Sequence, residues 1–410
     1  MEDFYKRLEC HSCGNKGLIK VLDLGATPLA NAFLSSEALG EPELIVPLAI
    51  NFCPECSLVQ LTHVVKGDVL FSDDYHYATS ASRPLVEHFK GLAQEIAKHY
   101  VKSPHDLVIE IGSNDGTLLS YLTKSCNVLG IDPARNMAAI ALTKGVPTVT
   151  EFLDMPLAER LRKEKGGAKV VVANNVMAHI DGIKDVFAAV KELLADDGRF
   201  IFEVHWVGNL VTEGGFDQIY HEHLFYYSLH SLRHMLGSLG MVINDVKLVP
   251  MHGESLRVYA GRSGESSQAV RDLLKREEEM GLAKAETYLA FSKKVFLNKE
   301  KLMKFLKDMK KSGKKIVGYG APGKGNTLLN YYGIGPDILD FITDTTPQKQ
   351  GTYTPGMHIP VVHPDRLKSE QPDYILLLSW NYADAILAKE KALRDQGVKF
   401  IVPVPEMKIV

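Results

Sequence analysis

The sequence has few cysteines, few tryptophans and no long apolar run. Five of its 410 residues are cysteine and two are tryptophan. No apolar stretch approaches the roughly 20 residues that a helix needs to cross a bilayer. The first ten residues have no apolar segment of the kind that marks a secretory signal peptide. We therefore expect a cytoplasmic protein with no membrane partner.

An excess of charge of one sign is also absent. Lys plus Arg number 47 and Asp plus Glu number 50, which gives a formal net charge of -3. Nucleic-acid-binding proteins usually carry a basic patch or a high isoelectric point, so we expect no nucleic-acid partner. Hydrophobic residues make up 45% and charged residues 24%, which is typical of globular proteins. At roughly 100–200 residues per domain, the length predicts two or three domains.

The cysteines that are present lie close together in the sequence. Four of the five form two C-x-x-C pairs, and these are Cys10, Cys13, Cys53 and Cys56. In a reducing compartment this spacing favours a metal site over disulfide bonds. Four thiolates close a tetrahedral shell, so we predict a structural Zn²⁺ in a ribbon-like module. The apolar residues between the pairs, such as Pro28 and Leu29, disfavour a ribbon that reads nucleic acid.

Beyond this module, short apolar runs alternate with helical patterns, which is typical of parallel sheets covered by helices. The predicted fold class is α/β multidomain, with a small zinc-ribbon-like N-terminal module, a central Rossmann-like domain and a C-terminal Rossmann-like α/β domain. A helix is predicted over 84–100 and strands over 107–111, 127–132, 170–173, 199–204, 341–344, 374–378 and 399–402. The expected domains are 1–75 for the zinc module, 76–265 for the central domain, 266–310 for a helical connector and 311–410 for the C-terminal domain.

The first glycine-rich loop, 110–116, follows a predicted strand and precedes a helix. It is not a G-x-G-x-x-G fingerprint, because Asn114 stands where a dinucleotide loop has its second glycine. Glu110 before the turn suits a cationic ligand that bears an amino acid, such as S-adenosylmethionine. Asp132 ends the next strand, where a carboxylate can accept hydrogen bonds from both ribose hydroxyls. Asn174 supplies polar groups at the same edge of the sheet.

The second loop, Gly318-x-Gly320-x-x-Gly323, matches the dinucleotide fingerprint, and Asp344 ends the following strand. Taken alone, it would indicate NAD. Lys324 directly after the loop fits a phosphate of a substrate equally well, held by a helix N-terminus and one ammonium. A loop whose glycines serve only packing is the third interpretation.

The third cluster is Tyr220-His221-Glu222-His223. The histidines are two residues apart, not the four that place a pair on one helical face in zinc proteases. On an extended strand Tyr220 and Glu222 would share one face and the histidines the other, whereas a loop removes that constraint. These residue types can act as general acids and bases near neutral pH. His179 could reach the same cleft. A polar network that satisfies a buried turn is the alternative interpretation.

Taken together, the motifs resemble the sugar C-methyltransferases of deoxysugar biosynthesis. Those enzymes methylate C3 of a nucleotide-linked 4-keto-6-deoxyhexose. The resemblance covers nearly the whole chain in the right order and rests on the paired C-x-x-C motifs and on 28–31, 75–80, 110–116, 219–223, 252–258 and 318–326. One departure is Glu254, where a second small residue is expected.

The resemblance implies a zinc module, a central S-adenosylmethionine domain and a C-terminal domain that helps to hold the nucleotide sugar. Implied cofactor-binding residues are Glu110, Gly112, Asn114, Asp132 and Asn174, with Tyr77 and Ser80 closing over the cofactor. In the implied reacting centre His223 takes the C3 proton, Tyr220 and His179 bind the enediolate, and Glu222 orients an imidazole. Candidate substrate contacts are Lys324, Asn326, Lys349, Trp380 and Asn381, although surface charge and sheet capping also explain them. The partner is then a nucleotide-linked keto-sugar, and the protein is a monomer or small homo-oligomer.

Three alternatives stay open. The first is a methyltransferase that acts on another ketone or on a hydroxyl group. The second is an NAD-dependent sugar-nucleotide oxidoreductase that uses 318–323 and Asp344. The third is a zinc-ribbon adaptor or RNA-binding protein, which would leave the acid–base cluster and both loops without a function.

Overall fold

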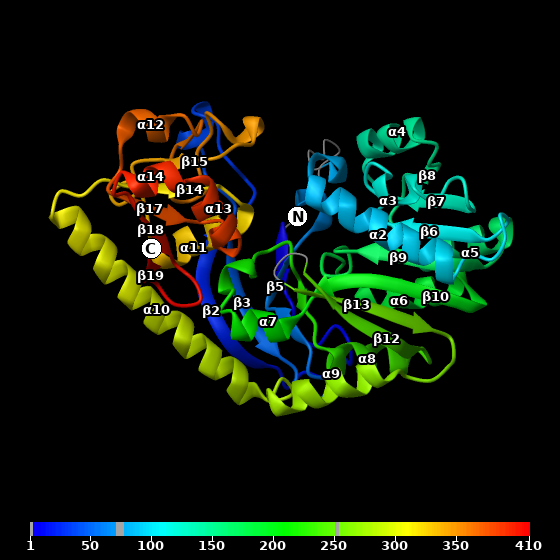
Figure 1. The fold of residues 1–410 in the computed structure, drawn as a ribbon. Coiled ribbons are helices and arrows are strands. Elements are labelled where there is room, and N and C mark those ends of the chain that lie inside the picture. Colours follow the sequence, from blue (N-terminus) through cyan, green and yellow to red (C-terminus); the bar gives the residue numbers. More distant parts are fainter. Residues whose placement is uncertain (1–2, 71–77, 251–253) are drawn as a thin grey trace.

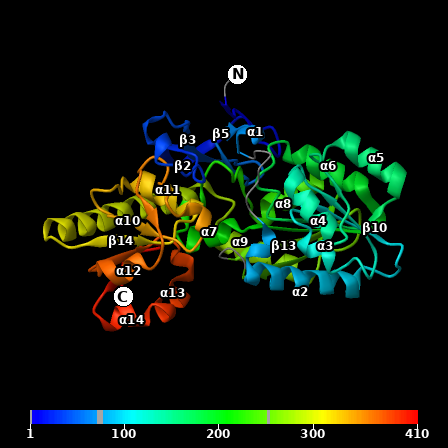
Figure 2. The ribbon, with the colours of Figure 1, turned by 90° about the horizontal axis from the view of Figure 1, so that it is seen from above.

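The computed structural model describes residues 3–70, 78–250 and 254–410. Three regions follow one another along the chain, and each contains a β-sheet. Figures 1 and 2 show the central and C-terminal regions as separate bodies, with the N-terminal strands lying along their junction.

The N-terminal module is antiparallel and is completed by a strand from the central region. Its elements are β1 (Phe4–Lys6), β2 (Ile19–Pro28), η1 (Glu37–Gly40), β3 (Ile45–Phe52), β4 (Val59–Leu61), β5 (His63–Val65) and α1 (Gly67–Leu70). The four-stranded sheet has the order β11-β4-β3-β2, where β11 (Phe225–Tyr226) directly follows the Tyr220–His223 cluster. Phe225 pairs with Gln60, so the module and the end of that cluster share backbone hydrogen bonds.

The central region is a seven-stranded sheet of order β12-β13-β10-β9-β6-β7-β8, in which five adjacent strands are parallel. Its strands are β6 (Leu107–Ile111), β7 (Asn127–Ile131), β8 (Thr148–Val149), β9 (Ala168–Asn174), β10 (Leu194–His205), β12 (Val242–Val249) and β13 (Ser255–Gly261). The helices are η2 (Thr79–Ala81), α2 (Arg83–His99), α3 (Thr117–Ser120), α4 (Arg135–Thr143), α5 (Met155–Lys165), α6 (Ile183–Leu193), α7 (Val207–Thr212), η3 (Phe216–Gln218) and α8 (Leu229–Ser238).

Helices cover both faces of this sheet, as the alternating pattern predicts. The predicted helix over 84–100 is α2, and its apolar stripe is buried against one face together with α3 and α4. Helices α5, α6 and α8 bury their apolar residues on the opposite face. The parallel arrangement brings the carboxyl ends of β6, β7 and β9 to one edge, which is where ligands bind in such sheets.

The connector consists of α9 (Gln268–Glu279) and the long α10 (Ala285–Lys311), which runs beside the C-terminal region in Figure 1. Leu302 and Leu306 of α10 are fully buried, whereas most of its lysines are exposed or partly exposed, as the apolar stripe predicts. Buried Glu277 accepts hydrogen bonds from the Trp206 Nε1 (2.7 Å) and from the amide of Leu229 (2.7 Å), so α9 is anchored to the central region.

The C-terminal region is a six-stranded sheet of order β16-β15-β14-β17-β18-β19, parallel except for β19. Its strands are β14 (Ile316–Tyr319), β15 (Ile342–Thr343), β16 (Val361–Val362), β17 (Tyr374–Leu377), β18 (Lys399–Val402) and β19 (Lys408–Ile409). The helices are α11 (Gly323–Tyr332), η4 (Pro347–Lys349), α12 (Arg366–Glu370), η5 (Trp380–Tyr382), α13 (Ala383–Lys389) and α14 (Lys391–Asp395).

The predicted fold class is confirmed, with a small N-terminal module followed by two α/β regions. Within the described ranges, none of the helices combines the length and apolar character that a membrane crossing requires.

Candidate metal centre and active site

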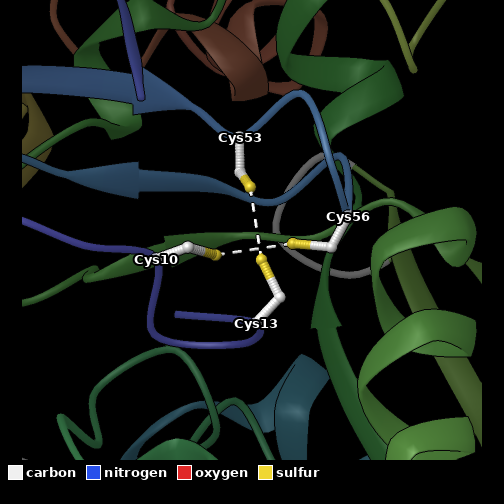
Figure 3. Close-up of side chains that lie close together, drawn as sticks. All are labelled: Cys10, Cys13, Cys53 and Cys56. Carbon is white, nitrogen blue, oxygen red and sulfur yellow. Dashed lines mark hydrogen bonds between the residues drawn. The ribbon is translucent and has the colours of Figure 1, made fainter. Parts of the chain in front are cut away.

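The four paired cysteines converge on one point (Figure 3). Their sulfur atoms all lie within 4.8 Å of one another, with Cys10 Sγ 3.4 Å from Cys56 Sγ and Cys13 Sγ 3.5 Å from Cys53 Sγ. A tetrahedral ion with Zn–S bonds of about 2.3 Å requires sulfur atoms at such spacings. Four thiolates leave no open position, so the donor set fits a structural Zn²⁺.

The first glycine-rich loop leaves β6 at the carboxyl edge of the central sheet. Gly112, Asn114 and Gly116 all have positive φ angles (65°, 50° and 72°), so this turn is tight and left-handed at three positions. Asp132 at the end of β7 fixes the turn, because its carboxylate accepts hydrogen bonds from the amide groups of Asn114 (2.7 Å) and Ala134 (2.9 Å). A carboxylate has lone pairs beyond these two bonds and can still accept from ribose hydroxyls.

Buried polar atoms without a partner mark this edge as a ligand site. Glu110 Oε2 and both polar side-chain atoms of Asn174 are buried and accept or donate no hydrogen bond to any other described residue. Such atoms are costly unless a ligand or water satisfies them. Burial raises the pKa of Glu110 well above its usual value, and the charge of Asp132 adds to this effect. Asn174 partly offsets the raised pKa of Glu110 through its side-chain amide. A cationic ligand would favour the ionised carboxylate, so these groups fit S-adenosylmethionine.

A segment of the chain docks onto this loop from outside the sheet. The Thr79 amide donates to Asn114 Oδ1 (2.9 Å), and the Ser80 amide donates to Asp115 Oδ2 (3.1 Å). The predicted closing residue Ser80 therefore contacts the loop through its backbone. Tyr77, the other predicted closing residue, lies outside the described residues.

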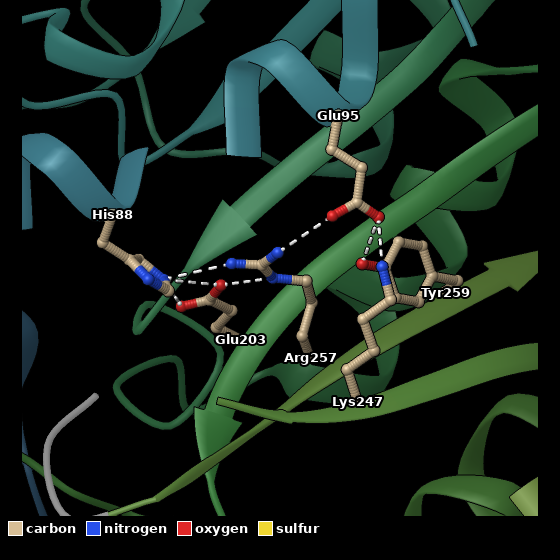
Figure 4. Close-up of polar contacts among 6 residues, drawn as sticks. All are labelled: His88, Glu95, Glu203, Lys247, Arg257 and Tyr259. Carbon is tan, nitrogen blue, oxygen red and sulfur yellow. Dashed lines mark hydrogen bonds and ion pairs between the residues drawn. The ribbon is translucent and has the colours of Figure 1, made fainter. Parts of the chain in front are cut away.

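Helix α2, which follows this docking segment, is held on the sheet by a buried ionic network (Figure 4). Arg257 of β13 donates to Glu203 Oε1 (2.6 Å) and to Glu95 Oε2 (3.2 Å), and His88 lies 2.9 Å from Glu203. Burial alone would raise the pKa of Glu203, but His88 and Arg257 lower it below its usual range. Glu203 pairs in register with Asn174, so the network adjoins the predicted cofactor site.

We define the acid–base cluster as Tyr220, Glu222, His223 and His179. Its segment 220–223 forms a turn instead of an extended strand. The His223 amide donates to the Tyr220 carbonyl (2.9 Å), and this turn brings the two side chains together. His223 Nδ1 lies 3.0 Å from the Gln218 carbonyl, which can only accept, so Nδ1 carries the proton. Nε2 is therefore the unprotonated nitrogen, and it accepts from the Tyr220 hydroxyl at 2.9 Å. In this arrangement Nε2 is the hydrogen-bond acceptor of the His223 ring.

Two further imidazoles flank His223. The rings of His179 and His205 each lie with their centroids 5.0 Å from that of His223. Burial lowers the pKa of His179 to about 4, and the backbone of Glu222 and Asn175 partly offsets this. His179 is thus neutral near pH 7 and suits hydrogen bonding more than charge storage. His221 lies apart, with its Nε2 3.2 Å from the Val46 carbonyl.

A pocket adjoins His223. Its lining includes His205, Gln218 and Glu254. Glu254 is the predicted departure from the family pattern, and its φ of 81° is one that favours small residues such as glycine. The departure therefore places a glutamate at a strained backbone position in the lining of the same pocket as His223.

The predicted substrate residues gather at the junction of the three regions, but four of them contact protein groups. Lys324 lies 3.8 Å from buried Asp217 and 4.0 Å from the Trp380 ring centre, and Trp380 Nε1 donates to Asp217 (2.7 Å). The remaining contacts are Asn326 Nδ2 to the Ala30 carbonyl (2.7 Å) and Lys349 Nζ to the Ala321 carbonyl (2.7 Å). Asn381 differs, because its buried Oδ1 has no partner within the described part of the chain.

Polar groups of the second glycine-rich loop also bond to protein. Asp344 accepts from the amide groups of Ala321 (2.6 Å) and Thr346 (2.7 Å). An added Cβ at Gly323 would lie 2.3 Å from Asn31 Oδ1 of the N-terminal module. The third glycine of the fingerprint therefore makes room for another part of this chain, which favours the packing interpretation.

Three residues at the site escape the sequence patterns. His205 ends β10, and the general rule that ligands lie at the carboxyl ends of parallel strands would have found it. Asp217 and Asn31 carry no local signal of a role, because their partners lie more than 100 residues away in the sequence.

Three family models match successive parts of the chain. A model described as a zinc binding domain matches residues 10–71, a methyltransferase domain matches 87–244, and a C-methyltransferase C-terminal domain matches 250–405. The magnesium protoporphyrin IX methyltransferase of Synechocystis, solved with bound S-adenosylmethionine, is 18% identical, with a TM-score of 0.34 over 46% of this chain and 86% of that chain. An S-adenosylmethionine-dependent methyltransferase from Clostridium acetobutylicum is 15% identical, with a TM-score of 0.35 over 48% and 96%.

The likeness to a curated relative extends over the full length. The C-methyltransferase NovU of Streptomyces niveus is 35% identical over 415 aligned residues, which cover 100% of this chain and 99% of NovU. The alignment thus spans the zinc module, the cofactor loop and the C-terminal region together. The chain belongs to the family of S-adenosylmethionine-dependent C-methyltransferases.

Proposed function

We propose that this enzyme methylates C3 of a nucleotide-linked 4-keto-6-deoxy sugar. The observation that carries the proposal is the geometry around His223, whose Nε2 lone pair accepts from Tyr220 while neutral His179 lies alongside. A carbon next to a ketone is acidic enough for an imidazole to deprotonate it when the resulting oxyanion is stabilised.

The reaction begins with removal of the C3 proton by His223 Nε2. The Tyr220 hydroxyl turns from His223 to the developing oxyanion, and His179 donates a second hydrogen bond to it. S-adenosylmethionine supplies an electrophilic methyl group. Held at the edge formed by Glu110 and Asp132, the cofactor would give this methyl to C3 and would leave as S-adenosylhomocysteine. The proton on His223 then passes to solvent, and Glu222 favours the transient imidazolium through its negative charge.

The sugar's nucleotide is proposed to lie against the C-terminal region. Asn381 is the strongest candidate contact, because its buried oxygen lacks a partner among the described residues. Lys324, Asn326, Lys349 and Trp380 stay predictions for this role, since their polar groups already contact the protein.

Proton exchange tests the base chemistry without methyl transfer. The enzyme is incubated with a 4-keto-6-deoxy sugar nucleotide and S-adenosylhomocysteine in D₂O. We expect deuterium to replace the proton at C3, which NMR measures. His223→Gln is expected to lose this exchange while it retains S-adenosylhomocysteine binding. His221→Gln is the matched control, because its ring faces the Val46 carbonyl, and we expect it to keep the exchange. Methyl transfer without exchange at C3 would indicate a hydroxyl acceptor instead.

A further inference from the structure

Asn31 belongs to the zinc module but contacts the acid–base cluster. It lies in the loop after β2, and its Nδ2 donates to Glu222 Oε1 at 2.6 Å. The two residues are 191 positions apart in the sequence. Asn31 is exposed, so its side chain adds little to the core, whereas Glu222 is partly buried. The hydrogen bond to Glu222 is thus the main interaction between the Asn31 side chain and the acid–base cluster.

The C-terminal region holds Asn31 in position. Gly323 begins α11, and an added Cβ there would lie 2.3 Å from Asn31 Oδ1 and 2.9 Å from its Cγ. The Gly323 φ angle is not left-handed, so this glycine is needed for space and not for backbone conformation. The carbonyl of the preceding residue, Ala30, accepts from Asn326 of the same helix at 2.7 Å. Helix α11 therefore fixes the Asn31 loop from one side while Glu222 lies on the other.

The contact affects the charge state of Glu222. Burial raises the pKa of Glu222, and the hydrogen bond from Asn31 acts in the opposite direction. An N–H donor stabilises a carboxylate more than a neutral carboxyl group. Loss of Asn31 would therefore leave Glu222 protonated up to a higher pH and free to rotate.

We propose that Asn31 is a positioning residue that holds the Glu222 carboxylate towards the reacting centre, with Gly323 as the spacer that admits it. The inference rests on the proposed function, because Glu222 is assigned to the reaction there. It also gives both flanking regions a part in catalysis, since the zinc module supplies the donor and the C-terminal helix sets its place.

The test compares three variants by steady-state kinetics over a range of pH. Asn31→Ala is expected to lower kcat roughly tenfold or more, the scale of one hydrogen bond to a charged group, with little change in KM for the nucleotide sugar. The acidic limb of its kcat profile is expected to move to higher pH. Asn31→Asp is expected to move this limb further, because two adjacent carboxylates disfavour ionisation of each other.

Gly323→Ala perturbs the contact without changing either partner. Its methyl group displaces Asn31, so we expect the same loss in kcat and the same pH shift as in Asn31→Ala. The double variant is expected to lose no more than either single variant, because both remove one interaction. The matched control is Gly237→Ala in α8, where an added Cβ meets nothing within 4 Å.

The positioning role of Asn31 and the proposed function can be overturned by different results. If the wild-type enzyme turns over the keto-sugar and both Asn31→Ala and Gly323→Ala keep its kcat and pH profile, the positioning role is wrong and the proposed function stands. If the wild-type enzyme neither methylates the keto-sugars nor exchanges their C3 proton, the proposed function fails and the positioning role fails with it. Carbon-13 NMR titration, assigned with Glu222→Gln, gives a readout that needs no substrate. An unchanged pKa of Glu222 in Asn31→Ala would also overturn the inference.

Discussion

The two glycine-rich loops of this protein share their local architecture and differ in what they hold. Each follows a buried parallel strand, and each is braced by an aspartate at the end of the next strand, Asp132 in the central region and Asp344 in the C-terminal region. The central loop lies beside buried Glu110 and Asn174 atoms that have no partner in the described ranges. The C-terminal loop packs against Asn31 of the zinc module instead.

The loop that matches the dinucleotide fingerprint is therefore the one filled by protein. Glycine spacing specifies a tight turn and a close approach, and either a phosphate or another segment of the chain can use that space. What the neighbouring polar groups already contact distinguishes the two cases better: at the C-terminal loop Asp344 bonds to protein amides and Gly323 faces Asn31. Buried atoms without a partner, which are costly without a ligand, lie directly beside the central loop and, in the C-terminal region, include Asn381 Oδ1.

Removal of the metal should disturb the packing of the C-terminal glycine-rich loop against the zinc module and leave ligand binding at the central loop intact. We expect chelation of zinc, or Cys53→Ser, to abolish methyl transfer, because four-thiolate sites supply much of the folding free energy of small modules. Binding of S-adenosylhomocysteine, measured by calorimetry, should stay within about threefold of the wild type. Loss of this binding together with the metal would show that the two loops are not independent.

The two aspartates allow a direct comparison. Asp132→Ala is expected to weaken S-adenosylhomocysteine binding by roughly 10²–10⁴-fold, because two charge-assisted hydrogen bonds of about 1.5–3 kcal/mol each are lost from the turn. Asp344→Ala, the same change in the other loop, should leave this affinity unchanged. Parallel titrations with NAD⁺ should give no heat. Heat that disappears in Asp344→Ala would restore the dinucleotide interpretation of the C-terminal loop.

The ionic network beneath α2 lies in the central region, next to the first glycine-rich loop and away from the second. Glu203→Gln is expected to lower the free energy of unfolding by about 3 kcal/mol, since it breaks a buried ion pair. The lowered pKa of Glu203 in the folded state means that its contribution is complete above the unfolded pKa of about 4.3 and is lost as the pH falls through the folded pKa. Denaturation of both proteins between about pH 3 and 7 should show their difference shrinking in acid. A constant difference would contradict the network's role.

The variant Lys324→Met distinguishes two roles of this lysine at the C-terminal loop, packing against Asp217 and binding of a substrate phosphate. Burial lowers the pKa of Lys324 and raises that of Asp217, and each charge partly offsets the shift of the other. Removal of the lysine leaves buried Asp217 with only Trp380 as a partner among these groups, so we expect a lower melting temperature. KM for the nucleotide sugar should stay unchanged. A raised KM with unchanged stability would assign Lys324 to the substrate phosphate.

Much of the fold could be predicted from the sequence, because helices and parallel strands have distinct apolar periodicities. The helix over 83–99 and the strands at 107–111 and 374–377 follow their predicted patterns closely. Periodicity says nothing about which regions touch. The pairing of Phe225 with Gln60 joins the zinc module to the reacting segment, and no local pattern encodes it.

The candidate site shows the same division. Cysteine spacing by itself determined the metal centre, since two C-x-x-C turns have few ways to place four thiolates. Strand-end residues such as Glu110 and Asp132 predict the cofactor edge, and the structure brings them to one edge of the central sheet. Only the tertiary structure decided that Tyr220 meets His223 through a turn, that Asn31 reaches Glu222, and that Gly323 faces protein. The reason is physical: periodicity and spacing describe neighbours along the chain, whereas the turn at Tyr220–His223 departs from any regular period and the contacts of Asn31 and Gly323 depend on how the three regions of the chain pack together.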